Sequence, residues 1–178
     1  MPLTGPALGA LRILLVEDSP EDAELMSEQM LDAGLEARFE RVESEAELRQ
    51  ALAVFQPDIV LSDLSMPGFS GDDALRIVRE TSPEVPFIFV SGTMGEENAV
   101  AALQKGANDY IIKHQPARLP SAVARAIRDA RSAVERARVE TELMRAQRLE
   151  SLSLLAAGLS HDLRNILQPL LIMPDLLK

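Results

Sequence analysis

The 178-residue sequence lacks cysteine and tryptophan, and it has only one tyrosine and five phenylalanines. Without cysteine, the chain can form neither a disulfide nor a thiolate metal site. Because aromatic residues are so few, the hydrophobic core must be mainly aliphatic. No apolar run is long enough to span a bilayer, and the N-terminal residues MPLTGPALGA lack the basic start and apolar centre of a signal peptide. We therefore expect a cytoplasmic protein.

Basic side chains are scarce in the first two thirds of the chain. Residues 1–115 carry 21 acidic and 8 basic side chains, a net charge of −13, whereas residues 116–178 carry 7 acidic and 10 basic ones, a net charge of +3. An acidic surface repels phosphate groups, which argues against nucleic acid as a partner of the first region. The asymmetry predicts two regions with different partners.

Residues 1–10 contain proline and glycine and are expected to be disordered, and from Leu11 onward apolar runs alternate with amphipathic segments. Strands that alternate with helices are joined by right-handed helical crossovers, so the sheet is parallel and covered on both faces. We predict a flavodoxin-like, doubly wound α/β fold with strand order 2-1-3-4-5. The expected strands are 11–18, 37–42, 57–63, 85–91 and 109–113, and the expected helices are 19–33, 44–55, 71–81 and 96–105.

The expected first helix has a serine and a proline at its start, followed by two acidic residues near the positive end of the helix dipole. Leu25, Met30 and Leu31 are expected to form its buried stripe, and Gly34 is expected to end it.

A long helix of 54 residues, about 80 Å in length, is predicted for residues 120–173. A helix of this length needs a partner. Its apolar residues recur in steps of three and four, in two stretches that are out of phase around Gln147, which predicts a coiled coil with a break in register. We expect a parallel homodimer through residues 120–173. The stretches are Val123, Ile127, Ala130, Val134 and Ala137, and then Leu149, Leu152, Ala156, Leu159, Leu163, Ile166 and Leu170.

Polar residues follow four of the predicted strands: Glu17 and Asp18, Asp63, Ser91 and Lys113. The carboxyl ends of these strands meet at one edge of a doubly wound sheet, where such sheets place their ligands. Three carboxylates at close range repel one another unless a cation compensates them, and oxygen-only ligands suit Mg²⁺ (or Mn²⁺). The pocket therefore predicts transfer of a phosphoryl group to Asp63, with Lys113 and Ser91 as partners of the phosphoryl oxygens.

The motifs ILLVED, LSDLSMPG, FVSGT and DYIIK resemble the receiver domains of bacterial two-component response regulators, over residues 11–131. The resemblance implies that Asp63 accepts a phosphoryl group from a phosphohistidine. It also implies that Asp18, Asp63 and the backbone carbonyl of Ser65 bind Mg²⁺, with Glu17 nearby.

The same resemblance implies that Lys113 contacts the phosphate and that Ser91 and Tyr110 form a switch pair. Receiver domains usually have proline directly after this lysine, often with a cis peptide bond, whereas His114 stands there in this chain. The difference leaves the geometry of the following loop open. We expect His114 to be a loop side chain.

A second motif surrounds His161 in LAAGLSHDLRNILQPLL. In the heptad pattern His161 lies outside the coiled-coil seam, with Asp162 beside it and Asn165 one helical turn away. A carboxylate next to an imidazole can fix its tautomer and take up its proton. Residues 148–178 resemble the first helix of the dimerisation and phosphotransfer domain of sensor histidine kinases, preceded by a coiled-coil linker at 132–147. The resemblance implies that His161 is phosphorylated, that Asp162 is its acid/base partner and that Asn165 assists phosphatase chemistry.

These patterns predict a phosphorelay protein whose phosphodonor is a histidine kinase or a phosphotransfer protein. No glycine-rich nucleotide-binding domain follows, so we expect the N-terminal part of a longer histidine kinase that does not autophosphorylate by itself. The first alternative is a stand-alone response regulator whose C-terminal helix only dimerises or binds a partner. A second, an enzyme of the haloacid dehalogenase type, ranks far lower because Asp63-Leu64-Ser65 lacks the second acid of D-x-D.

Overall fold

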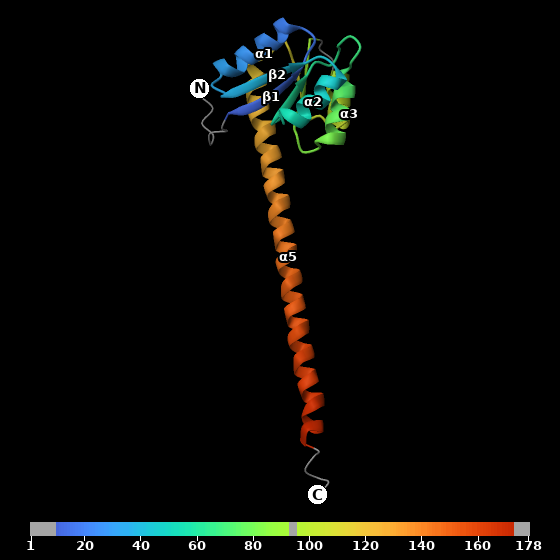
Figure 1. Ribbon diagram of the computed structural model, residues 1–178. Helices are drawn as coiled ribbons and strands as arrows, with labels where there is room; N and C mark the ends of the chain where they lie inside the picture. The colour runs from blue at the N-terminus through green and yellow to red at the C-terminus, as the bar shows by residue number, and fades with distance from the viewer. Residues whose placement is uncertain (1–9, 93–95, 173–178) are drawn as a thin grey trace. The chain divides into compact units, whose positions relative to one another are not determined.

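The computed structural model describes residues 10–92 and 96–172, so the prediction of disorder at 1–10 lies almost entirely outside the described residues. The chain divides into two compact units, Met1–Ser132 and Ala133–Lys178. The first unit holds a parallel sheet of five strands in the predicted order β2-β1-β3-β4-β5. Figure 1 shows β1 and β2 of this sheet together with helices α1, α2 and α3. The strands are β1 (Leu11–Val16), β2 (Ala37–Val42), β3 (Ile59–Ser62), β4 (Phe87–Ser91) and β5 (Asp109–Ile112). The helices are α1 (Pro20–Asp32), α2 (Glu45–Val54), α3 (Gly71–Thr81), α4 (Glu96–Gln104), the short 3₁₀ helix η1 (Pro116–Arg118) and α5 (Leu119–Ile172).

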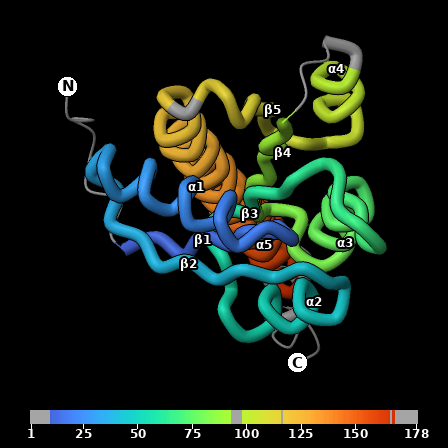
Figure 2. The backbone as a smooth tube through the Cα atoms, turned by 90° about the horizontal axis from the view of Figure 1, so that it is seen from above, coloured from blue at the N-terminus to red at the C-terminus, as the bar shows by residue number. Residues whose placement is uncertain are grey.

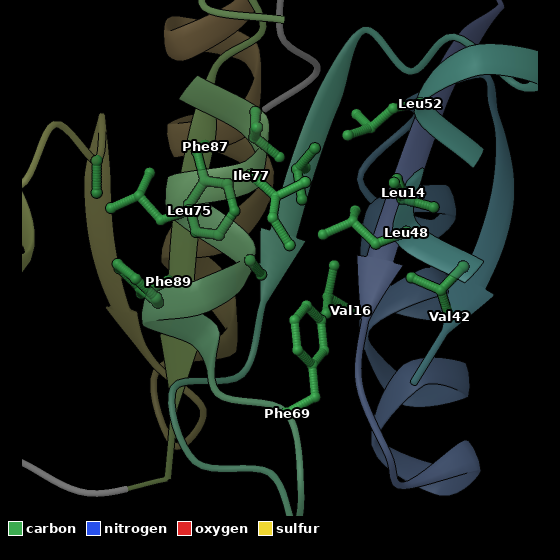
Figure 3. Packing of buried hydrophobic residues seen from close by; sticks show 14 of the residues in the cluster. Leu14, Val16, Val42, Leu48, Leu52, Phe69, Leu75, Ile77, Phe87 and Phe89 are labelled. Atoms are coloured by element: carbon green, nitrogen blue, oxygen red, sulfur yellow. The ribbon is translucent and has the colours of Figure 1, made fainter. Parts of the chain in front are cut away.

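The sheet is buried on both faces by helices. Helix α1 and the first turns of α5 lie on one face, and α2, α3 and α4 lie on the other (Figure 2). Side chains alternate along β1, so Leu14 and Val16 join the core under α2 and α3, while Ile13 and Leu15 join the core under α1 and α5. Figure 3 shows the first of these cores. In it the rings of Phe87 and Phe89 pack edge to face, with 5.0 Å between their centroids. The cores are otherwise mainly aliphatic, as the composition predicted.

The buried face of α1 differs from the prediction. Leu25 and Leu31 are 53% and 51% exposed, and the buried side chains are Ala23, Met26 and Met30. The three buried positions follow one another in steps of three and four, which places them on one helix face, whereas Leu25 and Leu31 lie off that face. The prediction that Leu25 and Leu31 are buried was therefore wrong.

The ends of α1 agree with the prediction. The Ser19 hydroxyl accepts a hydrogen bond from the amide of Asp22 at 3.2 Å and caps the first turn. Gly34 adopts φ +83° directly after the helix, and the amide of Leu35 donates to the carbonyl of Met30 at 3.1 Å. The helix therefore begins and ends where its cap residues indicate, and its start places Asp22 near the carboxyl ends of the strands.

Helix α5 confirms the prediction of a long C-terminal helix. Within the first unit, its residues Leu119, Val123 and Ile127 are buried against the sheet. Within the second unit, large apolar side chains remain exposed. They include Val134, Val139, Leu143, Met144, Leu149, Leu152, Leu154, Leu155, Leu159, Leu163 and Leu167. Among the described residues, no helix is both long and apolar enough to cross a membrane.

Candidate functional site

The carboxyl ends of β1, β3, β4 and β5 lie together at one edge of the sheet, as predicted. The amide of Asp63 donates to the carbonyl of Val16 at 2.9 Å, so the residue after β3 is tied to the last residue of β1. The amide of Lys113 donates to the carbonyl of Ser91 at 2.8 Å, which links the ends of β5 and β4 in the same way. The ladder register therefore brings the predicted polar residues to one place.

The Lys113 ammonium is the centre of this cluster. Its Nζ lies 2.7 Å from Asp63 Oδ2 and 2.9 Å from Glu17 Oε2. A third carboxylate, Asp22 Oδ2 on the first turn of α1, lies 2.6 Å away. Asp22 was not among the predicted site residues, because the acids of this turn were expected only to interact with the helix dipole. No spacing in the sequence indicates a contact between residues 22 and 113.

The charges at the centre of the cluster are largely shielded from water. Glu17 is only 1% exposed, and the side chains of Asp63 and Lys113 are 13% and 17% exposed. Burial raises the pKa of the Glu17 carboxyl, although the hydrogen bond from Lys113 works in the opposite direction. Burial alone would lower the pKa of Lys113, but hydrogen bonds to Asp22, Asp63 and Glu17 outweigh it and raise that pKa. The lysine is therefore a firmly held cation at neutral pH.

Three carboxylates could hold a metal ion here. Glu17, Asp18 and Asp63 each offer one oxygen, and these oxygens all lie within 4.8 Å of one another. A set of hard oxygen donors in a partly buried, negatively charged pocket fits Mg²⁺ better than the softer metals that select nitrogen or sulfur. The amide of Ser65 donates to Asp63 Oδ1 at 3.1 Å, so Ser65 and Lys113 contact different oxygens of the same carboxylate.

The loop that carries Glu17 and Asp18 is held from β2. Arg41 Nη1 donates to the carbonyl oxygens of Glu17 at 2.9 Å and of Asp18 at 3.4 Å, and it also contacts Glu43 Oε2 at 2.7 Å. The amide of Ser19 donates to Glu17 Oε1 at 3.2 Å. These contacts fix both the main chain and one carboxylate of the acidic pair. Arg41 was not among the predicted site residues, because nothing in the sequence around Arg41 indicates this contact.

Ser91 and Tyr110 are both buried. Ser91, the last residue of β4, is 3% exposed. Tyr110 in β5 is 8% exposed and belongs to the core under α2 and α3. The loop after Lys113 forms a turn in which the amide of Gln115 donates to the carbonyl of Ile112 at 2.8 Å. His114 is exposed in this turn, as expected, and the described residues contain no cis peptide bond.

The three residues of the second motif meet on α5, in the second unit. His161 Nδ1 lies 3.4 Å from Asp162 Oδ1 and 3.3 Å from Asn165 Nδ2. Asp162 requires a protonated Nδ1 and Asn165 an unprotonated one, so the two contacts belong to different tautomers of the ring. Both contacts use Nδ1, and neither occupies Nε2. The His161 and Asp162 side chains are 72% and 75% exposed.

Comparison with known protein families assigns the first unit. The family model described as "Response regulator receiver domain" matches residues 13–124. The chain belongs to this family. It therefore contains a receiver domain of two-component signalling. The matched residues end before His161, so the family match does not bear on the second motif.

Individual relatives agree with this assignment. The chain is 36% identical to the transcriptional regulatory protein YvcP of Bacillus subtilis over 102 residues. This aligned region is 57% of this chain and 42% of that protein. It resembles the crystal structure of NtrX from Brucella abortus, with a TM-score of 0.65 and 28% identity over 73% of this chain and 29% of the other. It also resembles the receiver domain of a signal transduction histidine kinase from Syntrophus aciditrophicus, with a TM-score of 0.58 and 29% identity over 67% and 92% of the two chains. The chain spans less than half the length of the first curated relatives that it matches.

Proposed function

We propose that this receiver accepts a phosphoryl group on Asp63 and that it acts in a phosphorelay. The observation that carries the proposal is the contact of 2.7 Å between Lys113 Nζ and Asp63 Oδ2, at the strand-end edge of a chain that belongs to the receiver family. A carboxylate is a nucleophile at neutral pH, and a fixed cation beside it can balance the charge that a phosphoryl group brings. The phosphodonor is a histidine kinase or a phosphotransfer protein.

Each residue of the site has a role in this proposal. A Mg²⁺ or Mn²⁺ ion would be held by Glu17, Asp18, Asp63 and the backbone carbonyl of Ser65. An ion held there would supply positive charge beside the transferred group. The amide of Ser65 orients the Asp63 carboxylate through its contact of 3.1 Å with Oδ1. The proximity of the three carboxylates, within 4.8 Å, supports this ligand set.

Two residues report the phosphorylated state in this proposal. The Ser91 hydroxyl donates to a phosphoryl oxygen, and Tyr110 follows it as the second member of the switch pair. Their positions on the neighbouring strands β4 and β5 support the pairing, since the ladder aligns Ser91 with Ile112, two residues after Tyr110. A change at this pair would alter the surface near α4 and the start of α5.

We further propose that residues 148–178 are the first helix of a histidine kinase phosphotransfer domain, joined to the receiver (11–131) by the coiled-coil linker 132–147. His161 then accepts a phosphoryl group at Nε2, while Asp162 holds the opposite ring nitrogen and Asn165 assists hydrolysis. The contact of Asp162 with Nδ1 supports this assignment, because it requires the tautomer in which Nε2 is unprotonated. The amide of Asn165 lies beside the same ring. The receiver from Syntrophus aciditrophicus, which belongs to a histidine kinase, supports such a combination of domains.

A parallel homodimer through residues 120–173 completes the proposal. Leu149, Leu152, Leu159 and Leu163 lie at seam positions of the heptad pattern and are each more than half exposed in the single chain. Apolar side chains in such a row are stabilised when a second helix covers them. In the alternative of a stand-alone response regulator, this helix only dimerises or binds a partner, and His161 carries no phosphoryl group.

Intact mass spectrometry tests the receiver part of the proposal. The full chain is incubated with acetyl phosphate and Mg²⁺, beside Asp63→Asn and His161→Gln. We expect one phosphoryl adduct on the parent chain and on His161→Gln, and no adduct on Asp63→Asn. An adduct that persists in Asp63→Asn would contradict the assignment of Asp63.

A histidine phosphotransfer assay tests the second part. The chain is mixed with an ATP-binding domain of a histidine kinase. Treatment with acid and with alkali then distinguishes alkali-stable phosphoryl groups from acid-stable ones. Alkali-stable phosphate on the parent chain that is absent from His161→Gln would support the kinase helix. Equal labelling of the two chains would favour the stand-alone response regulator.

A further inference from the structure

Among the side-chain contacts of Lys113 with the described residues, the proposed phosphoryl transfer uses those with Asp63 and Glu17 but not the one with Asp22. Its Oδ2 lies 2.6 Å from Lys113 Nζ, which is closer than either Asp63 or Glu17. Asp22 lies on α1, outside the group of three carboxylates that could hold a metal among the described residues. In the proposed function, Glu17 and Asp63 also serve the metal or the phosphoryl group. Of these three carboxylates, Asp22 is therefore the one that can stay hydrogen-bonded to Lys113 throughout the transfer.

The placement of Asp22 is fixed by the local structure. Its amide donates to Ser19 Oγ at 3.2 Å, which sets its position in the first turn of α1. Its side chain is 42% exposed, whereas that of Lys113 is 17% exposed, so Asp22 approaches the ammonium from the solvent side. Asp22 and Lys113 also line a cavity of about 40 Å³ whose other walls include Leu25, Met26 and Ile112.

The three contacts use all the hydrogen-bond donors of the ammonium. A lysine ammonium has three N–H groups, and the structure gives it three carboxylate acceptors. During transfer from acetyl phosphate, an Asp63 oxygen forms a bond to phosphorus while the phosphorus–oxygen bond of the donor breaks and acetate leaves. One N–H of Lys113 must then move from the Asp63 carboxylate to a phosphoryl oxygen. A long, flexible lysine side chain makes this movement accurately only if another contact holds it in place.

We propose that Asp22 is a positioning residue that holds the Lys113 ammonium beside Asp63 while the phosphoryl group is transferred. The inference rests on the proposed function, since it assumes that Asp63 is phosphorylated. Two other roles make different predictions. If Asp22 only stabilises the start of α1, its loss leaves the transfer rate unchanged. If Asp22 competes with the phosphoryl group for Lys113, its loss makes transfer faster.

The test measures the initial rate of adduct formation with acetyl phosphate and Mg²⁺, in the full chain. Asp22→Ala should be about tenfold slower than the parent, which is the effect expected for one lost hydrogen bond to a charge. Asp22→Glu should recover part of the rate. The matched control is Glu21→Ala, which removes a neighbouring acid of the same turn whose hydrogen bond is to Ser19 Oγ at 3.5 Å. Its rate should equal that of the parent.

A second measurement reports the contact without phosphorylation. The chain has only three lysines, Lys105, Lys113 and Lys178, so their ¹⁵N ammonium signals are easily assigned by NMR. The Lys113 signal should be visible in the parent and in Glu21→Ala, and it should be lost to solvent exchange in Asp22→Ala. A retained signal together with an unchanged or faster rate would overturn the positioning role. If the parent forms no adduct, the proposed function fails, and the NMR signal still decides separately whether Asp22 holds Lys113.

Discussion

Gly71, the first residue of α3, packs directly against the main chain of Asp63. A Cβ atom at position 71 would lie 2.3 Å from the carbonyl oxygen of Asp63 and 2.9 Å from the ring of Phe89. The amide of Gly71 also donates to the carbonyl of Leu64 at 3.2 Å. The loop that carries the proposed phosphoacceptor is therefore held against a helix start that has room only for glycine.

Gly71→Ala should disturb the site and the fold together. The added methyl group meets main-chain atoms, which cannot move aside as a flexible side chain could, so we expect a loss of about 2 kcal/mol in the free energy of unfolding. We also expect slower phosphorylation of Asp63. The control is Gly158→Ala on α5, where a Cβ meets nothing within 4 Å and alanine favours the helix. Urea unfolding followed by circular dichroism measures both, and equal stabilities would contradict the packing argument.

Arg79 should contribute more to stability than its neighbour Arg76. Arg79 donates to the carbonyls of Gly106 and Val85 and to Asn108 Oδ1, at distances from 2.7 to 3.0 Å. These bonds join the end of α3 to the starts of β4 and β5, and removing them leaves several acceptors without a donor.

We expect Arg79→Leu to lower the free energy of unfolding by about 2–4 kcal/mol. Arg76→Leu is the matched control, since Arg76 lies on the same helix and its ion pairs with Asp73 and Glu80 are exposed. Its loss should amount to about 0.5 kcal/mol. Thermal and urea unfolding of both variants provide the comparison, and a control that is as unstable as Arg79→Leu would argue against the role of these bonds.

Mg²⁺ should stabilise the receiver through its carboxylates. An ion that binds only the folded chain raises the free energy of unfolding by about 2.7 kcal/mol at one hundred times its dissociation constant. The midpoint of thermal unfolding should therefore rise on addition of Mg²⁺ and fall again with EDTA. The rise should be much smaller in Asp18→Asn. It should be unchanged in Asp72→Asn, whose carboxylate lies outside the site and pairs with Lys105 at 2.7 Å. Equal shifts in all three proteins would indicate non-specific binding.

Leu159→Arg should weaken the proposed dimer, whereas Leu154→Arg should not. Both leucines are exposed in the single chain, at 65% and 69%. In the heptad pattern Leu159 lies in the seam and Leu154 lies on the outer face, one heptad before His161. Sedimentation equilibrium of the full chain measures the association constant. Association that is equally weak, or equally strong, in both variants would contradict the predicted seam.

The fold could be predicted because the central strands β3 and β4 are buried on both faces. A fully buried parallel strand requires a nearly continuous apolar run, such as Ile59–Ser62. The serine N-caps Ser19 and Ser44 mark the starts of α1 and α2 between such runs. The buried face of α1 could not be predicted from hydrophobicity alone. Leu25 and Leu31 are more apolar than Ala23, but the phase of the helix relative to the sheet decides which side chains are buried.

The candidate site could be predicted only where its residues follow directly on a strand. Glu17, Asp63 and Lys113 meet this condition, since the sheet topology alone brings the strand ends together. Asp22 and Arg41 do not, because their contacts with residues 113 and 17 depend on the positions of α1 and β2 in three dimensions. Sequence periodicity carries no information about such long-range side-chain pairs.

The measurement that tests the central claim most directly is chemical trapping of the phosphorylated residue. Borohydride reduces an aspartyl phosphate to homoserine, so the chain is treated with acetyl phosphate and Mg²⁺, reduced, digested and sequenced by mass spectrometry. We predict homoserine at position 63 alone, present with both reagents and absent when either is left out. Reduction at Asp18 or Asp22 instead, or no reduction at position 63, would contradict the assignment of Asp63 as the phosphoacceptor.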